Sequence, residues 1–190
     1  YKILTSIAGL EEEIITSTDT IYDGVEYTKV EPHAYCWSKY SHGDLNCANA
    51  IMHSCNYFFY ELGYRMGTQS TTSLSDKNGL AILSKYAGMF GLNETTGIEL
   101  PETKPNVSDM SVVRSAIGQG TNAYTAANLV RYITAVANSG DLFRLTVLDK
   151  TTDSDGNVTK DIEPELIRHI ELKEGTWDTV HSGMYKVCNQ

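Results

Sequence analysis

The chain has few positive charges and no long hydrophobic run, and each shortage excludes a class of protein. The chain has 15 lysines and arginines and 24 acidic residues, which gives a net charge of -9. No basic cluster interrupts this excess, which argues against a nucleic-acid partner. No apolar run approaches the ~18 residues of a membrane span. Residues 1–4 resemble the interior of a helix and not a signal peptide, so we expect these 190 residues to be part of a longer chain.

Cysteines are also few, and their positions, Cys36, Cys47, Cys55 and Cys188, lack the spacing of metal ligands. Each is expected to be a small, buried, apolar residue. The sequence leaves open a Cys36–Cys55 bridge in an oxidising compartment. The aspartate-rich turn at 153–157 lacks the glutamate and the leading helix of a calcium loop. The sequence therefore predicts neither a metal site nor a cofactor.

The chain does contain an organised stretch from residue 36 to residue 63. Asp44 is predicted to be the N-cap of a first helix, whose apolar residues recur at helical spacing, and a second helix is expected to end at Gly63. Ser54 and Asn56 lie in the turn between these helices. Alternation in a tight turn is expected to place both side chains on one side and Cys55 on the other.

An S-x-N pair alone would fit a capped helix-helix turn, but here it stands among other landmarks of one family. The stretch 36–63 resembles class B penicillin-binding proteins at several positions: Trp37, His42-Gly43, Ala50-Ile51, Ser54-Cys55-Asn56, Phe59-Tyr60 and Leu62-Gly63. Segments 96–102 and 117–120 come next, in the family's order. The resemblance covers nearly the whole chain. It implies an α/β fold of the serine β-lactamase/DD-transpeptidase type, mainly its helical lobe with a short hairpin and an incomplete central sheet.

The resemblance also implies how the chain is divided. Residues 1–140 would form the helical lobe that carries S-x-N, and residues 141–190 a hairpin and a helix preceding the family's K-T-G strand. That strand would then lie beyond Gln190. The family's nucleophilic Ser begins the first helix as S-x-x-K. Residues 1–11 resemble the part of the family's helix that comes after the Ser-Thr of this motif. Lys2 would therefore be the motif's lysine, and the Ser would lie two residues before Tyr1.

The function that the resemblance implies is peptidoglycan D,D-transpeptidation, inhibited by β-lactams. Lys2 would activate the Ser, Ser54 would relay a proton, and Asn56 would hold the substrate's amide carbonyl. Partners would be peptidoglycan stem peptides, β-lactam antibiotics and the cell-wall synthesis machinery. The parent protein would be anchored in the bacterial membrane and act on its extracytoplasmic face, while the fragment alone would be inactive.

Two alternatives share the fold: a β-lactamase and a non-enzymatic β-lactam sensor domain. Class A β-lactamases carry an E-x-x-L-N stretch, but Met89 stands where its glutamate would be. The sensor would be recognised by membrane signalling helices that its full gene encodes outside this domain.

Three further elements are predicted from periodicity and capping. A helix starts after Thr125, with Leu129, Ile133, Val136 and Ala137 as its buried face. A strand covers 142–148, and Thr176 caps a last helix. His181-Ser182-Gly183 lies inside that helical pattern and is therefore not the K-T-G element.

Overall fold

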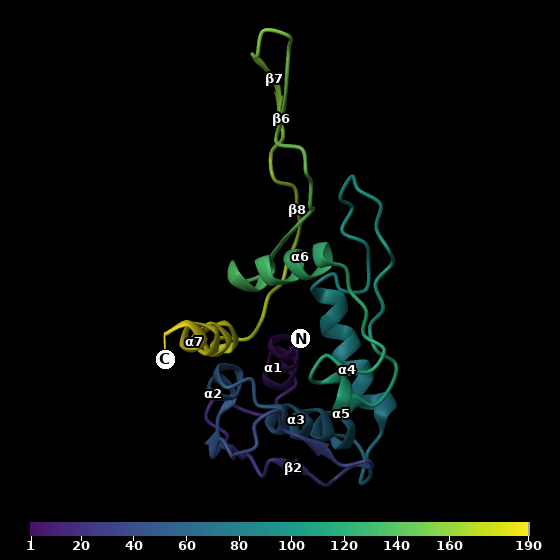
Figure 1. Cartoon of the computed structure of the whole chain (residues 1–190), viewed down its shortest axis with the longest axis vertical. Coiled ribbons are helices and arrows are strands. Elements are labelled where there is room, and N and C mark those ends of the chain that lie inside the picture. Colours follow the sequence, from purple (N-terminus) through teal and green to yellow (C-terminus); the bar gives the residue numbers. More distant parts are fainter. Residues whose placement is uncertain (190) are drawn as a thin grey trace. The chain divides into compact units, whose positions relative to one another are not determined.

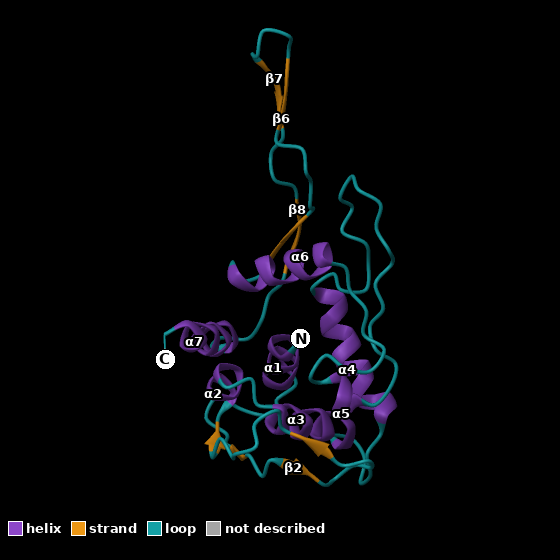
Figure 2. Ribbon diagram, viewed as in Figure 1, coloured by secondary structure: helices purple, strands orange, loops and turns teal. Residues whose placement is uncertain are grey.

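The structure is a computed structural model in which residues 1–189 are described, and the chain forms two compact units (Figure 1). Unit 1 comprises residues 1–87, 107–122 and 172 onward, and unit 2 comprises residues 88–106 and 123–171. Both units combine helices with two-stranded antiparallel sheets (Figure 2). Among residues 1–189, no helix has both the length and the apolar composition required to cross a bilayer.

Unit 1 is built around the first helix. Its helices are α1 (Lys2–Glu11), α2 (Cys47–Met52), α3 (Asn56–Thr68), most of α4 (Asp76–Met89), α5 (Val112–Ser115) and α7 (Thr176–Cys188). Helix α1 packs against α2, α3 and α7, and α2 packs closely on α7. The close approach of α7 to α2 depends on Gly183. A Cβ added at this position would lie 2.8 Å from the Cβ of Ile51 in α2. Because α1 packs against three helices, its first residues are held in a defined place.

Two small sheets of unit 1 flank these helices. Strand β1 (Ile21–Tyr22) pairs with β4 (Asp44–Leu45), and β2 (Glu26–Tyr27) pairs with β3 (Ala34–Tyr35). Each strand is only two residues long, so most of residues 21–45 lie in the segments that join the strands.

Unit 2 contains α6 (Ala126–Ala137) and two hairpin-like pairs. Strand β5 (Asp141–Phe143) pairs with β8 (Leu166–His169), and β6 (Lys150–Thr152) pairs with β7 (Val158–Asp161). Thr125 and Asn128 form a capping box at the start of α6, which confirms the predicted cap. The predicted strand 142–148 was too long, because pairing with β8 ends at Phe143.

Only Val136 of the predicted buried face of α6 is buried, and Ala137 at the end of the helix is exposed. Leu129 and Ile133 are exposed, whereas Arg131 and Tyr132 are buried. The Arg131 guanidinium donates to the backbone carbonyl of Gly91 at 2.6 Å, and to those of residues 94–96 at longer range. Hydrogen bonds from Arg131 to the carbonyls of an irregular loop therefore place a polar face of the helix inward. The spacing of apolar residues along the sequence does not predict such long-range hydrogen bonds.

Three predicted helix ends also differ. Asp44 is in strand β4, and the N-cap of α2 is Asn46, whose side chain accepts from the Asn49 N–H at 3.0 Å. Helix α3 does not end at Gly63 but continues to Thr68. Gly63 instead allows close contact with Ala116. The N-cap of α7 is Gly175, while the Thr176 hydroxyl donates to Glu11.

Candidate active site

The turn that carries Ser54 joins α2 to α3 and has an unusual backbone. Ser54 has φ 49°, a left-handed conformation that a residue with a Cβ rarely adopts. The turn is closed by the Ser54 N–H donating to Ile51 O at 3.0 Å and the Cys55 N–H donating to Ala50 O at 3.1 Å. Such a conformation costs about 1–3 kcal/mol, so the surroundings must hold it in place.

Lys2 provides part of that restraint from the start of α1. Its Nζ donates to Ser54 Oγ at 2.8 Å, to Ser54 O at 2.6 Å and to Asn56 Oδ1 at 2.6 Å. All three hydrogens of the ammonium group are therefore used. The predicted arrangement is confirmed: Ser54 and Asn56 lie on one side of the turn, facing Lys2. All three residues that the sequence predicted for the site meet at one nitrogen atom.

Trp37 holds the same turn from outside. Its indole N–H lies 3.1 Å from both His53 O and Ser54 O. The carbonyl of Ser54 thus accepts from two side chains that come from distant parts of the chain. This explains how a strained residue between two helices stays in place.

The surroundings of the Lys2 amine shift its pKa. Burial lowers the pKa of Lys2, and the sulfur atoms of Cys36 and Cys55 oppose this shift in part. A lowered lysine pKa raises the fraction of neutral amine near neutral pH, which is the form that can accept a proton.

A cleft of about 540 Å³ opens beside Lys2 and Ser54. Its walls are mainly apolar, and its lining residues are Tyr1, Lys2, Ile3, Ile51, Ser54, Ile117, Met184, Val187 and Cys188. An apolar cleft with a few convergent polar groups is typical of a site that binds a small molecule or a peptide end. The hydroxyl and the amine are thus placed where they could reach a bound substrate.

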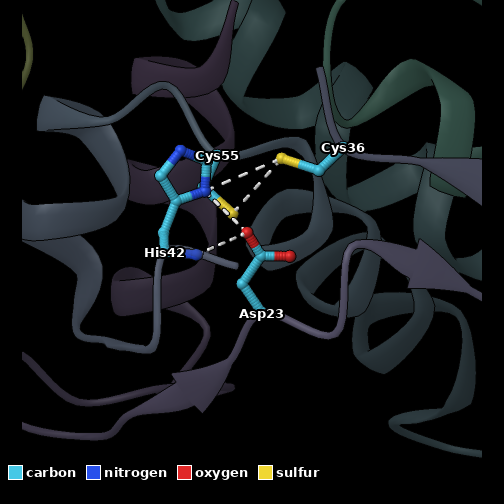
Figure 3. Close-up of side chains that lie close together, drawn as sticks. All are labelled: Asp23, Cys36, His42 and Cys55. Atoms are coloured by element: carbon cyan, nitrogen blue, oxygen red, sulfur yellow. Dashed lines mark hydrogen bonds and ion pairs between the residues drawn. The ribbon is translucent and has the colours of Figure 1, made fainter. Parts of the chain in front are cut away.

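Around Cys55, the residue between Ser54 and Asn56, four side chains that could bind a metal come together (Figure 3). They are Asp23, Cys36, His42 and Cys55, and their ligand atoms all lie within 4.8 Å of one another. The two sulfur atoms are 3.9 Å apart, Cys36 Sγ lies 3.9 Å from His42 Nδ1, and His42 Nδ1 lies 2.6 Å from Asp23 Oδ2. Sequence spacing did not predict this cluster, because its members are distributed over 33 positions without a short motif.

These donors fit a tetrahedral zinc ion. Two thiolates bound to tetrahedral zinc with Zn–S bonds of ~2.3 Å lie about 3.8 Å apart, close to the separation of Cys36 and Cys55. One imidazole and one carboxylate complete four ligands. The ion would replace the short Asp23–His42 hydrogen bond and move those two atoms apart.

Hydrogen bonds and burial shift the pKa values of three groups in the cluster. A hydrogen bond from Cys55 lowers the pKa of the Cys36 thiol to about 5, whereas the same contact and burial raise the pKa of Cys55. Burial opposes ionisation of Asp23, yet hydrogen bonds from the Val25 and His42 backbone and from the His42 ring keep its pKa below the ordinary value. The cluster thus already contains one favoured carboxylate and one favoured thiolate.

The other cysteines lie apart from this cluster. Cys47 is fully buried in α2, as predicted, whereas Cys188 is exposed near the end of α7, which corrects the expectation that every cysteine is buried.

Comparison with known proteins identifies the family. The penicillin binding protein transpeptidase domain matches residues 1–190. The peptidoglycan D,D-transpeptidase MrdA of Escherichia coli K12 is 24% identical over 206 residues, which include the whole of this chain and 30% of MrdA. Stage V sporulation protein D of Bacillus subtilis is 28% identical over 151 residues, covering 75% of this chain and 21% of that protein. The chain belongs to the class B, MrdA-like penicillin-binding protein transpeptidase domains.

Solved structures share the fold, which is of the DD-transpeptidase/β-lactamase type as predicted. Penicillin-binding protein 2B of Streptococcus pneumoniae superposes with a TM-score of 0.81 at 20% identity, covering 99% of this chain and 34% of that one. PBP2 of Helicobacter pylori in its complex with MreC superposes with a TM-score of 0.75 at 22% identity, covering all of this chain and 34% of that one. The chain thus spans about a third of the length of these relatives.

Proposed function

We propose that this chain is the central part of a serine-type peptidoglycan D,D-transpeptidase. The observation that carries the proposal is the convergence of Ser54 Oγ and Asn56 Oδ1 on Lys2 Nζ beside an apolar cleft. The nucleophile would be the Ser of an S-x-x-K motif, three residues before Lys2. A serine hydroxyl needs a nearby base, and one helical turn separates it from Lys2.

In acylation, the neutral Lys2 amine would take the proton of the attacking Ser. The Ser oxygen would attack the carbonyl of the D-Ala-D-Ala bond, an acyl ester would form, and D-Ala would leave. Lys2, now charged, can pass a proton through Ser54 Oγ to the leaving amine, because that oxygen is 2.8 Å away. Asn56 would orient Lys2 through its Oδ1 and offer its amide N–H groups to the substrate's carbonyl. A neighbouring stem-peptide amine would then displace the Ser and form the cross-link.

The substrates and partners belong to the same proposal. Stem peptides would enter the cleft, and β-lactams would acylate the same Ser and remain attached. A relative of this fold forms a complex with MreC, and we propose that the parent of this chain likewise works in a cell-wall synthesis assembly. It would be membrane-anchored and act on the extracytoplasmic face of the bacterial membrane.

We further propose that Asp23, Cys36, His42 and Cys55 bind a structural zinc ion. Four protein ligands leave no open position, so the ion would have a structural role. Cys55 lies between Ser54 and Asn56, and the ion would therefore hold the turn through Cys55. Such an ion would help to maintain the left-handed backbone at Ser54.

The nucleophile assignment predicts where penicillin attaches. The 190-residue chain incubated with a labelled penicillin should show no covalent adduct by intact mass, whereas a longer chain with the upstream Ser and the downstream K-T-G strand should show one adduct on that Ser. An adduct on Ser54, or on any other residue of this chain, would contradict the proposal.

The base assignment predicts a pH dependence. Because burial lowers the pKa of Lys2, acylation of the longer chain should accelerate with pH along a limb whose midpoint lies below 10.5, the ordinary lysine value. The amine is neutral above that midpoint and cationic below it. Lys2→Arg keeps a cation but cannot give up its proton, so this variant should be slow at every pH. Stopped-flow acylation rates measure both, and a Lys2→Arg variant with the normal limb would exclude Lys2 as the base.

A further inference from the structure

Cys36 and Cys55 are two buried thiols from separate segments that meet directly behind the S-x-N turn. Cys36 comes directly after β3, and Cys55 is the N-cap of α3, so neither lies inside a regular element. Their sulfur atoms are 3.9 Å apart, and a disulfide requires about 2.05 Å. Cys47 and Cys188 make no such pair among the described residues.

We propose that Cys36 and Cys55 are a redox-sensitive pair, and that their disulfide and their shared metal ion exclude each other. The redox pairing stands on the geometry of the two thiols alone. The mutual exclusion of disulfide and metal ion rests on the zinc site proposed above. A disulfide consumes the two sulfur ligands, which leaves Asp23 and His42 as an incomplete set. A bound ion, in turn, occupies both sulfur atoms and blocks their reaction.

A peroxide is an oxidant of suitable size, because Cys36 is only 7% exposed and Cys55 is fully buried. The Cys36 sulfur attacks one peroxide oxygen, the O–O bond breaks, and the leaving hydroxide takes a proton to form water, which leaves a sulfenic acid. The Cys55 sulfur then attacks the Cys36 sulfur, the S–O bond breaks, and a second water leaves. One peroxide is reduced to two waters as two thiols become one disulfide.

The bridge would disturb the catalytic turn. Cys55 is covalently between Ser54 and Asn56, and closing the bridge draws its sulfur toward Cys36. Ser54 Oγ and Asn56 Oδ1 contact Lys2 at 2.8 and 2.6 Å, distances that a shift of the turn would change. A misplacement of about 1 Å can cost on the order of 10²-fold in rate. Oxidation should therefore slow acylation by at least about tenfold, and a thiol reductant should restore it.

The chemical test uses the chain with Cys188→Ser, which removes the exposed thiol. After treatment with a chelator, hydrogen peroxide should lower the intact mass by two hydrogen atoms, and peptide mapping should link Cys36 to Cys55. Excess Zn²⁺ added before the peroxide should prevent the link. Cys36→Ser is the matched variant that cannot bridge, and unreacted Cys47 reports that the chain stays folded.

The outcomes separate the two proposals. A metal-free chain that forms no Cys36–Cys55 link, or links Cys47 instead, overturns the redox pair. A chain that binds zinc by native mass spectrometry yet bridges equally fast overturns the exclusion. A chain that bridges but binds no zinc overturns the metal site and leaves the pair intact.

The functional test uses the longer chain that carries the nucleophilic Ser. The acylation rate after peroxide, divided by the rate before it, should fall well below one for the native cysteines. The same quotient should stay near one for Cys36→Asp, which supplies an oxygen ligand but cannot bridge. An equal loss in both proteins would show that peroxide acts elsewhere and would overturn the effect on the turn.

Discussion

Replacing Ser54 or Asn56 with Ala in a chain that carries the nucleophilic Ser should slow acylation by penicillin on the order of 10²–10⁴-fold, the range of a positioned proton-transfer group. Ser54→Ala removes the hydroxyl that contacts Lys2, so the leaving amine loses its proton relay. Asn56→Ala removes one of the three acceptors that orient the Lys2 amine. A fluorescent penicillin measures both rates directly.

The fold should change little in these variants, because Ser54 is exposed and Asn56 is only half-buried. Ser70→Ala, at an exposed position in the loop after α3, is a matched control that should acylate at the normal rate. Thermal unfolding of all three proteins separates a lost proton relay from a lost structure. Normal acylation in both site variants would reduce Ser54 and Asn56 to a structural turn.

Zinc should bind the chain with one ion per molecule and stabilise it strongly. Ligand present at 100 times its dissociation constant adds about 2.7 kcal/mol to the free energy of unfolding. For a chain of this size that corresponds to a rise of roughly 5–10 °C in the unfolding temperature. Cys55→Ser and Asp23→Asn should each remove most of this zinc-dependent rise.

Cys47→Ser is the control for the zinc experiment, since Cys47 is a fully buried cysteine outside the cluster. It should lower the stability of the chain but keep the rise on adding zinc. Native mass spectrometry gives the number of bound ions, and a calorimetric scan gives the shift. An identical zinc-dependent rise in Cys55→Ser would assign the metal to other residues.

The local sequence was enough for the elements whose determinants are close together in the chain. The cap at Thr125 and the turn between two helices at Ser54 were predicted from apolar spacing and polar caps, and the structure confirms them. The helix starts at Asn46 and Gly175 were missed by one or two residues, because several polar residues nearby could serve as caps and only packing chooses among them.

The candidate site was predicted in two different ways. Ser54 and Asn56 are two positions apart, so alternation in a tight turn determined that they share a side. Lys2 is more than 50 positions away, and it was assigned to them by resemblance to the family. The packing of α1 against α3 is what brings its amine to hydrogen-bonding distance.

The sequence by itself determined the family, the positions of most helices and the identity of the polar turn, because these depend on short-range spacing and on motifs. Only the tertiary structure decided the buried face of α6 and the meeting of Asp23, Cys36, His42 and Cys55. In both cases the partners are distant segments: the carbonyls of loop 91–96 for Arg131, and three connections between short strands and helices for the cluster. Spacing along a chain carries no information about such contacts, since the closure of long loops determines which side chains meet.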